Sequence, residues 1–413
     1  MSAIRPVELY RLPWSLTDNA ISWLEPTSAC NLACEGCYRE NRKFSHKPLD
    51  VVARELDVFA RLRRADSISI AGGEPLAHPD IVAIVRMVKE RGWKAVINSN
   101  GALLTPELLR ELAAAGVDGF TFHVDSKQNR PGWKDADEEK LNALRLRLAE
   151  MLAAEGNITC SFNATVYPDT LKDIPLILRW AQEHIDIVHV VVFILYRNAR
   201  LASGFHYYVG AQRVELDGIA YGRPDDPVER FLHASDALEA ARTGGEEITP
   251  CAYLGGTEQP DSTKWLLSLR VGTRDRIFGY TGPKFMELVQ VGYHFLHGKY
   301  LAYASPKTQR RGRVVFLAAP IDRRVRRICG QLLRHWVKSP ASFFRRVHFQ
   351  SIMIIQPADV DDAGRINMCD GCPDITVWED RLVWSCRLEE QYRWGVNMHL
   401  VRKETAPEDV RLS

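Results

Sequence analysis

The sequence predicts an α/β protein whose main part is a partial (β/α)6 barrel of the TIM type. Within about 180 residues, an apolar strand, a polar turn and an amphipathic helix follow one another six times. Several of these strands are apolar on both faces, as is typical of parallel strands covered by helices. In such barrels the chemistry lies on the loops at the carboxyl ends of the strands.

Turn and cap signals bound the expected elements. Thr105 is expected to cap a helix that Pro106 begins, and Gly92 is expected to stop the helix before it. The expected strands are 20–27, 67–75, 94–101, 119–126, 158–166 and 187–197. The expected helices are 51–64, 80–92, 106–116, 139–156 and 171–185.

After the sixth strand the alternation stops, and the composition suggests further divisions. A stretch rich in Gly, Asp and Pro, with one expected helix at 227–242, is typical of a connector. A strand at 264–271 is expected to open a small α+β domain, and a hairpin at 377–386 is expected to close it. We therefore predict an N-terminal extension (1–19), the barrel (20–200), a connector (201–250), the small α+β domain (251–400) with a basic amphipathic insert (about 284–355), and a C-terminal tail (401–413).

The chain has 413 residues and nine cysteines, six of which fall in two tight groups. No apolar run approaches the roughly 20 residues that span a bilayer, and the N-terminus has no signal-peptide pattern. We therefore expect a cytoplasmic protein whose grouped thiols bind metal rather than form disulfides. Of the other thiols, Cys160 is expected to be buried in a strand and Cys329 in the core face of a helix.

Cys30, Cys34 and Cys37 form a C-x3-C-x2-C loop directly after the first expected strand. Three thiolates are one fewer than a closed zinc site or a fully protein-ligated iron–sulfur cluster needs. One coordination position would therefore stay open. On this spacing alone the loop could bind zinc, with His46 or His78 as a further ligand, an iron–sulfur cluster, or no metal.

Two further loops narrow the choice. Gly72-Gly73-Glu74-Pro75 follows the second expected strand, and Asn98-Ser99-Asn100-Gly101 follows the third. With the cysteine loop and the adjacent Tyr38, these loops resemble the radical S-adenosylmethionine (SAM) enzymes over roughly residues 20–200. Zinc binding would explain neither the Gly-Gly-Glu-Pro loop nor the sixfold alternation of strand and helix.

The resemblance implies a 4Fe-4S cluster on Cys30, Cys34 and Cys37, as the catalytic centre, with one iron open to SAM. An electron from a donor such as flavodoxin or ferredoxin would cleave SAM to a 5′-deoxyadenosyl radical, which would abstract hydrogen from an unactivated carbon of the substrate. The residues implied as contacts to SAM or the cluster are Tyr38, Gly72, Gly73, Glu74, Pro75, Asn98, Asn100, Asp125, Ser126 and Asn163.

The second cysteine group, Cys369, Cys372 and Cys386, has the spacing C-x2-C-x13-C. Within the same family such groups hold an auxiliary 4Fe-4S cluster in a short twitch domain or a longer SPASM domain, and four available cysteines favour the twitch form. We expect Cys251 as the fourth ligand; otherwise the second cluster also has an open iron, and structural zinc is the remaining alternative. The Arg-x-Arg run of the GTP cyclases is missing after Cys372, which disfavours that activity.

The charge is strongly uneven. Residues 299–346 hold 13 Lys and Arg against one acid, so this segment has a net charge of +12 and the remainder of −10. The arginines alternate with Phe, Leu, Val and Trp, a composition typical of helices that lie on anionic lipid. A solvated charged face, or a phosphorylated small molecule as ligand, would also fit; nucleic acid is unlikely because aliphatic residues are too frequent.

Three functions remain open on the sequence alone. The first is a radical SAM enzyme, peripheral to the inner face of the membrane, that acts on a lipid or another anionic amphiphile. The second is a radical SAM maturase that modifies a peptide, and the third is a non-catalytic, metal-binding scaffold on membranes.

Overall fold

The computed structural model describes residues 4–196, 205–216, 232–361 and 363–403. In this part of the chain the main sheet has eleven strands in the order β1-β10-β11-β13-β7-β6-β5-β4-β3-β2, with β12 beside β11. None of the helices in these residues is long and apolar enough to span a bilayer.

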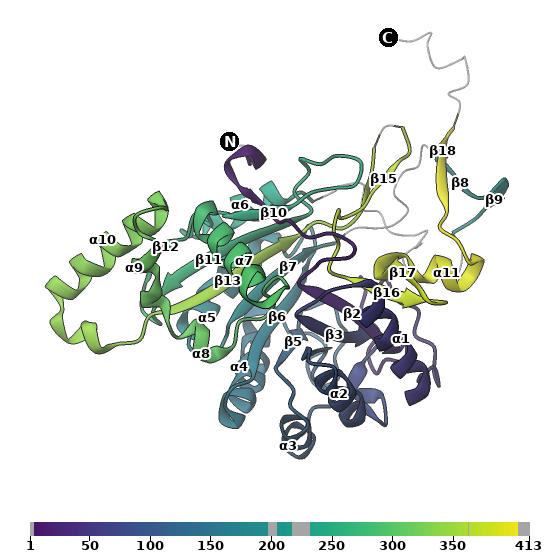
Figure 1. Cartoon of the computed structure of the whole chain (residues 1–413), viewed down its shortest axis with the longest axis horizontal. Coiled ribbons are helices and arrows are strands. Elements are labelled where there is room, and N and C mark those ends of the chain that lie inside the picture. Colours follow the sequence, from purple (N-terminus) through teal and green to yellow (C-terminus); the bar gives the residue numbers. More distant parts are fainter. Residues whose placement is uncertain (1–3, 197–204, 217–231, 362, 404–413) are drawn as a thin grey trace, which may run out of the picture.

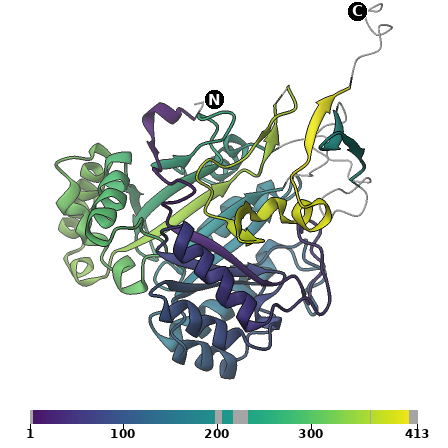
Figure 2. The ribbon, with the colours of Figure 1, turned by 45° about the vertical axis from the view of Figure 1, so that its right-hand side comes forward.

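The strands from β2 to β7 are all parallel, and helices α1 to α5 alternate with them to form the predicted partial barrel (Figures 1 and 2). All six predicted strands are confirmed within a few residues. They are β2 (Ile21–Thr27), β3 (Ser67–Gly72), β4 (Lys94–Ser99), β5 (Gly119–His123), β6 (Thr159–Val166) and β7 (Val190–Leu195). The helices are α1 (Leu49–Leu62), α2 (Ile81–Glu90), α3 (Pro106–Ala114), α4 (Glu138–Glu155) and α5 (Ile174–Glu183).

Alternate side chains of these strands point outward and pack under the helices. Ile70 of β3, Ile97 of β4 and Phe120 of β5 belong to this buried cluster. The Thr105 cap is also confirmed, since its hydroxyl accepts a hydrogen bond from the Leu108 amide (3.2 Å). Burial of this apolar layer against the helices stabilises the barrel and fixes where each strand ends.

The sheet continues beyond residue 251. Strand β13 (His348–Ile355) pairs in parallel with β7 and antiparallel with β11 (Trp265–Gly272), and β10 (Ala252–Leu254) pairs with β1 (Tyr10–Arg11). Residues 348–355, which we predicted as the end of the basic insert, are thus a strand within the main sheet. Strands before and after residue 251 thus pair within one sheet. The domain boundary at residue 251 remains a prediction.

Most of the predicted basic insert forms a helical subdomain, residues 283–346. Its elements are α7 (Pro283–His297), α8 (Pro306–Gln309), α9 (Val315–Ala318), α10 (Arg323–Lys338) and the 3-10 turn Pro340–Phe344. Cys329 lies on the buried face of α10, as expected, and Cys160 is buried in β6.

The helical subdomain covers the amino-terminal ends of the barrel strands. The Tyr293 hydroxyl donates to the Asp66 carboxylate (3.0 Å) just before β3, and the Thr159 hydroxyl donates to the Ala304 carbonyl (3.3 Å) at the start of β6. The Tyr303 hydroxyl lies 3.2 Å from the Ser69 hydroxyl inside the barrel. This end of the barrel is therefore closed by the subdomain.

The last part of the chain runs beside β2 (Figure 1). Asn19 and Arg63, near the amino-terminal end of that strand, donate to the Gly371 and Cys372 carbonyls (2.8 and 2.7 Å), and the Ser385 hydroxyl donates to Glu25 near its carboxyl end. The predicted hairpin is confirmed as β16 (Ile375–Trp378) and β17 (Arg381–Trp384), and α11 (Leu388–Trp394) follows it. The smaller elements are β12 (Ile277–Tyr280), β14 (Asp359–Val360), β15 (Ile366–Asn367) and β18 (His399–Arg402).

The predicted connector contains strands and a helix. Strand β8 (Phe205–Val209) pairs with β9 (Gln212–Val214) and with β18, and α6 (Ala234–Thr243) packs against α5. The helix that we predicted from residue 227 starts at Ala234; residues 227–231 lie outside the described residues. Residues 404–413 of the predicted tail also lie outside them.

Candidate active site

The cysteine loop follows β2, at the carboxyl end of the barrel. Cys30, Cys34 and Cys37 lie close enough for their charges to interact. Partial burial, together with the neighbouring Asp125, Cys37 and Cys30, raises the pKa of the Cys34 thiol to about 12. The three thiols predicted to share a cluster are thus brought together, and a positively charged metal centre would favour their thiolate form.

The glycines of the Gly-Gly-Glu-Pro loop allow it to lie directly against the cysteine loop. The Gly73 amide donates to the Thr27 carbonyl (2.8 Å), and the Glu74 amide donates to the Ala29 carbonyl (2.8 Å). A Cβ atom on Gly73 would lie 2.3 Å from the Ala29 carbonyl oxygen, and Gly72 has a φ of +107°. Only glycine fits this close backbone approach.

Glu74 braces two loops rather than projecting freely into the site. Its carboxylate accepts hydrogen bonds from the Leu76 amide (3.0 Å), the Ser99 hydroxyl (2.8 Å) and the Asn100 amide (2.7 Å). Burial raises its pKa. The structure thus gives Glu74 a positioning role that the motif alone did not indicate, and Pro75 starts the short buried turn that follows it.

Asparagine side chains border the same space. Asn100 Nδ2 donates to Asn31 Oδ1 (2.7 Å) and lies 3.9 Å from Cys30 Sγ. Asn98 Nδ2 and Asn163 Oδ1 are buried and have no hydrogen-bond partner among the described residues. Buried polar atoms of this kind normally need a partner, so these two fit contact with a polar ligand.

Asp125 is held by its neighbours at the end of β5. Burial would raise the pKa of its carboxyl, but the hydrogen bonds from His123 Nε2 (2.9 Å) and the Lys127 amide (2.9 Å) outweigh burial and lower it. The Ser126 amide donates to Glu138 Oε1 (2.7 Å), so its backbone is fixed as well.

Arg130 is a site residue that the sequence did not reveal. Its buried guanidinium donates to the Asn100 carbonyl (2.8 Å) and to Gln128 Oε1 (2.8 Å). Burial lowers its pKa, while the nearby Cys34 and Asp125 favour its charged form. A positive charge beside the thiols suits an anionic ligand set, but a lone arginine in a loop gives no local sequence signal.

A comparison with protein families gives the superfamily. The model described as "Radical SAM superfamily" matches residues 24–181, which include the cysteine loop, the glycine loop and the asparagine loop. Residues 24–181 therefore form a radical SAM domain. Enzymes of this superfamily use SAM and a 4Fe-4S cluster, and the donor set described above fits both.

Curated relatives match part of the chain. A "Tungsten-containing aldehyde ferredoxin oxidoreductase cofactor-modifying protein" of Pyrococcus furiosus is 40% identical over 106 residues, which cover 25% of this chain and 30% of that protein. An "AdoMet-dependent heme synthase" of Methanosarcina barkeri is 29% identical over 185 residues, 42% of this chain and 50% of that protein. The chain therefore spans half or less of the length of these curated relatives.

Among solved structures, Streptococcus suis SuiB bound to the precursor peptide SuiA is similar at 20% identity and a TM-score of 0.35. The match covers 44% of this chain and 40% of that one. The assignment of the fold to this superfamily depends on the family match and on the strand order of the chain itself, since so low a score adds nothing.

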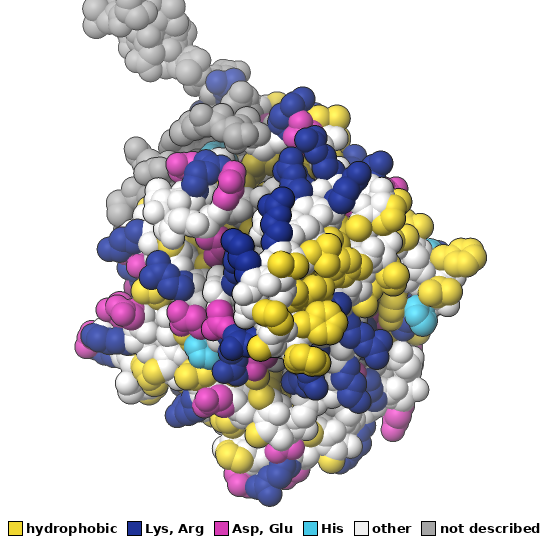
Figure 3. Space-filling view, turned by 90° about the vertical axis from the view of Figure 1, so that its left-hand side faces the viewer, with side chains coloured by type: hydrophobic (Ala, Val, Ile, Leu, Met, Phe, Trp, Pro, Cys, Tyr) yellow, Lys and Arg dark blue, Asp and Glu magenta, His cyan; other side chains and the backbone are white. Residues whose placement is uncertain are grey.

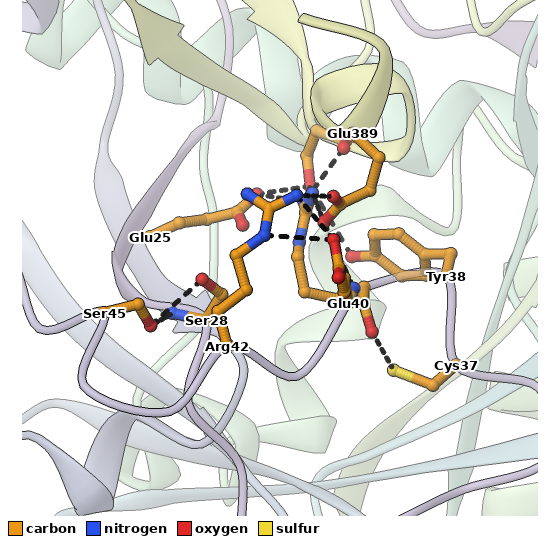
Figure 4. Close-up of polar contacts among 10 residues, drawn as sticks. Glu25, Ser28, Cys37, Tyr38, Glu40, Arg42, Ser45 and Glu389 are labelled. Atoms are coloured by element: carbon orange, nitrogen blue, oxygen red, sulfur yellow. Dashed lines mark hydrogen bonds and ion pairs between the residues drawn. The ribbon is translucent and has the colours of Figure 1, made fainter. Parts of the chain in front are cut away.

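The cysteine loop of the radical SAM domain is also tied to the C-terminal elements by a buried ion-pair network (Figure 4). Arg39 Nη2 donates to Glu25 Oε1 of β2 (2.7 Å), and Arg39 Nη1 donates to Glu389 Oε1 of α11 (3.2 Å). The Ser385 hydroxyl donates to the same Glu25 oxygen (2.7 Å) and lies 3.5 Å from the Tyr38 hydroxyl. The loop of Cys37 and the turn that contains Cys386 are thus joined through Arg39.

The second cysteine group gathers Cys369, Cys372 and Cys386. The pKa of the Cys372 thiol is raised, first by its hydrogen bond with Cys369 and then by burial, and Cys386 adds to this. Among the described residues, no set of three Cys, His, Asp or Glu side chains is arranged to hold a single metal ion.

Cys251 does not join this group. Its thiol donates to the Leu267 carbonyl (3.5 Å), and burial raises its pKa to about 12, with Thr281 and Arg324 the nearest polar side chains. Cys369 instead pairs with Gly256, five residues further along the chain. Cys251 precedes β10 and Gly256 follows it, so this strand separates the two positions. The expected fourth ligand is thus not brought to the other three.

Proposed function

We propose that this radical SAM protein reductively cleaves SAM and uses the product to abstract hydrogen from an unactivated carbon of its substrate. The observation that supports this most is that three thiols of one loop lie beside the glycine loop and the buried, unpartnered atoms of Asn98 and Asn163. In its loaded form, the cluster would supply the electron that breaks the carbon–sulfur bond of SAM.

The protein residues have distinct proposed roles at this site. Cys30, Cys34 and Cys37 would hold three irons, and Gly72 and Gly73 would let backbone carbonyls approach the SAM amino group. Asn98 would donate to SAM and Asn163 would accept from it, while Tyr38, Asn100, Asp125 and Ser126 border the same ligand. Glu74 and Arg130 would position these loops.

We also propose that Cys369, Cys372 and Cys386 hold a second 4Fe-4S cluster in a twitch-like unit. The support is the closeness of these thiols and the C-x2-C turn followed by a hairpin. With Cys251 elsewhere, this cluster would have three protein thiolates, so one iron would be open to a further ligand. Reduced flavodoxin or ferredoxin is the proposed electron donor.

The proposed substrate class is an amphiphile with an anionic head, such as a lipid. Its support is the basic and apolar surface of the helical subdomain, which suits a protein that works at a lipid surface. The names of the relatives refer to cofactor modification, haem synthesis and GTP cyclisation, which are three different substrate classes.

The test is iron content and SAM cleavage after anaerobic reconstitution. Two 4Fe-4S clusters give about eight irons per chain, and replacing Cys30, Cys34 and Cys37 with Ala should leave about four. With dithionite, the parent should form 5′-deoxyadenosine and this variant should not. Cys251→Ala is the matched control, since its thiol lies outside both groups, and it should keep about eight irons.

Two outcomes would refute the proposal. Unchanged iron in the first-loop variant would remove the cluster from that loop. Intact SAM in the fully loaded parent would leave a non-catalytic metal-binding scaffold as the better description. Loss of about half the iron in Cys251→Ala would instead restore Cys251 as a ligand.

A further inference from the structure

The helical subdomain concentrates the exposed apolar side chains of the molecule. Among the described residues, eighteen large hydrophobic side chains are exposed, and eleven of these lie between residues 288 and 344. They are Leu288, Val291, Phe295, Leu296, Val314, Leu317, Ile321, Leu333, Val337, Phe343 and Phe344. Monomeric soluble proteins rarely expose apolar residues in such a group without a partner for them.

Helix α10 shows how this surface is built. Its inner face buries Val325, Ile328 and Leu332 against the rest of the subdomain. Its outer face has exposed Leu333 and Val337 in the last two turns, followed by Phe344, which is 85% exposed. These exposed side chains are not needed for the core, because the opposite face of α10 already packs against the subdomain. With Leu317 and Phe343, we call Leu333, Val337 and Phe344 the apolar crest.

The crest is held firmly from below. The Trp336 ring packs against Phe316 (centroids 5.7 Å apart) and against the edge of Phe343 (5.1 Å). The Arg313 guanidinium lies 4.8 Å from the Phe343 ring centre. Exposed Phe343 and Phe344 are thus fixed in place and do not fold back to cover themselves.

Cations border the crest on the same helix. Arg323, Arg326, Arg327, Arg334 and Lys338 are exposed, and no carboxylate in the described residues forms an ion pair with any of them. Asp322 is buried and caps α10, accepting from the Arg324 and Val325 amides. Figure 3, which faces this end of the molecule, shows hydrophobic side chains gathered in one area with Lys and Arg above and below it.

We infer that this surface docks on an anionic lipid bilayer, with the crest of Leu317, Leu333, Val337, Phe343 and Phe344 entering the interface. The bordering arginines would contact lipid phosphates. Apolar burial and charge attraction together give the interfacial binding expected of such a surface. The inference goes beyond the proposed radical chemistry and holds whether or not the chain cleaves SAM.

Two other occupants fit less well. A second copy of the chain would bring two surfaces with the same strong positive charge together, which costs free energy. A nucleic acid would satisfy the arginines but would leave the aliphatic crest without an apolar partner. An anionic bilayer satisfies both halves of the surface.

The test is co-flotation of the full chain with vesicles of phosphatidylcholine, with and without phosphatidylglycerol. The parent should bind only the anionic vesicles, and more salt should weaken binding. Changing Arg323, Arg326, Arg327 and Arg334 to Glu should weaken binding about a thousandfold, since each basic residue contributes on the order of 1 kcal/mol at such a surface and about 1.4 kcal/mol corresponds to a tenfold change.

The matched charge control changes four exposed cations on barrel helices, Arg61, Arg86, Lys140 and Arg147, to Glu, and it should bind nearly as the parent does. The apolar arm, Leu317→Ser with Val337→Ser and Phe344→Ser, should also weaken binding, whereas Val7→Ser should not. Circular dichroism confirms that each variant is folded.

Three results would overturn the inference. The first is no binding of the parent to anionic vesicles. The second is equal weakening by the two charge variants, which would mean that net charge alone is sensed. The third is a dimer of the parent that the crest variant dissociates, which would make a second copy the partner of this face.

Discussion

Arg39 joins the two cysteine-containing loops through one buried guanidinium. It lies between the carboxylates of Glu25 and Glu389, each of which is 3% exposed, and it also donates to the Ser385 carbonyl (2.9 Å). A buried charge persists when it is both paired and hydrogen-bonded. The geometry of the Cys37 loop relative to the Cys386 turn therefore depends on this residue.

We predict that Arg39→Ala destabilises the protein by about 3–5 kcal/mol, because it leaves two buried carboxylates without their cation. Arg42→Ala is the matched control: this neighbour pairs with Glu40 and Glu389 but its side chain is 34% exposed. Its loss should cost about 1 kcal/mol or less. Urea unfolding followed by circular dichroism measures both, and equal losses would contradict the network.

For single residues, the sequence predicts the features that depend only on neighbouring residues in the chain. The Thr105 cap follows from a Ser/Thr-type cap before proline, and the need for glycine at Gly73 follows from the loop motif. The role of Glu74 and the separation of Cys251 from Cys372 do not follow, because both depend on which loops meet in space. Arg39 was missed for the same reason: within its charged loop, nothing marks it as buried.

Strand β13 is a strand of the main sheet that the sequence analysis did not predict. Its alternating burial is clear in the structure, where His348, Gln350, Ile352 and Ile354 are buried. The strand adjoins an arginine-rich helix in sequence, but its partner β7 lies some 160 residues earlier, as the pairing of Ser351 with Val190 shows. The six barrel strands were predictable because each is followed by its own helix; β13 has no such local partner.

A buried histidine, His189, directly precedes β7, where β7 pairs with β13. The Cys160 amide donates to His189 Nδ1 (3.0 Å), and the Ser351 amide donates to the His189 carbonyl (3.0 Å). Burial, together with the nearby charges of Arg310 and His348, lowers the pKa of His189 to about 4. The folded protein therefore disfavours the protonated imidazole, whereas the unfolded chain does not.

We predict that buried His189 makes the stability of the protein sensitive to acid. The unfolded histidine takes up a proton near pH 6.5, while the folded one does so near pH 4, so stability is full above this window and falls as the pH is lowered through it. From neutral pH to about pH 5, the loss from His189 is about 2 kcal/mol. His189→Asn keeps an acceptor for the Cys160 amide and should remove this part of the pH dependence.

The measurement is urea unfolding at a series of pH values, with His297→Asn as a control that changes an exposed histidine. The control should follow the parent. A His189→Asn curve parallel to that of the parent would show that His189 does not cause the acid sensitivity.

The apolar crest and the C-terminal elements around α11 lie at opposite ends of the long axis of the molecule. In Figure 1, α9 and α10 lie at one end, and α11 with the β16–β17 hairpin lies at the other. The helical subdomain covers the amino-terminal ends of the barrel strands, while the cysteine and glycine loops follow their carboxyl ends. A bilayer held by the crest would therefore face away from the loop of Cys30, Cys34 and Cys37. On this proposal the surface would attach the protein to the membrane without itself leading a lipid to that loop.

This separation gives a prediction about the bound enzyme. Anionic vesicles that bind nearly all of the reconstituted protein should leave its rate of reductive SAM cleavage unchanged, because the cysteine loops stay in water when the opposite end is docked. The measurement is 5′-deoxyadenosine formation with and without vesicles, and the four-arginine variant serves as the unbound control. If vesicles slow the parent but not this variant, the docking face must lie against the cysteine loops, and the placement of the two surfaces at opposite ends of the barrel would be wrong.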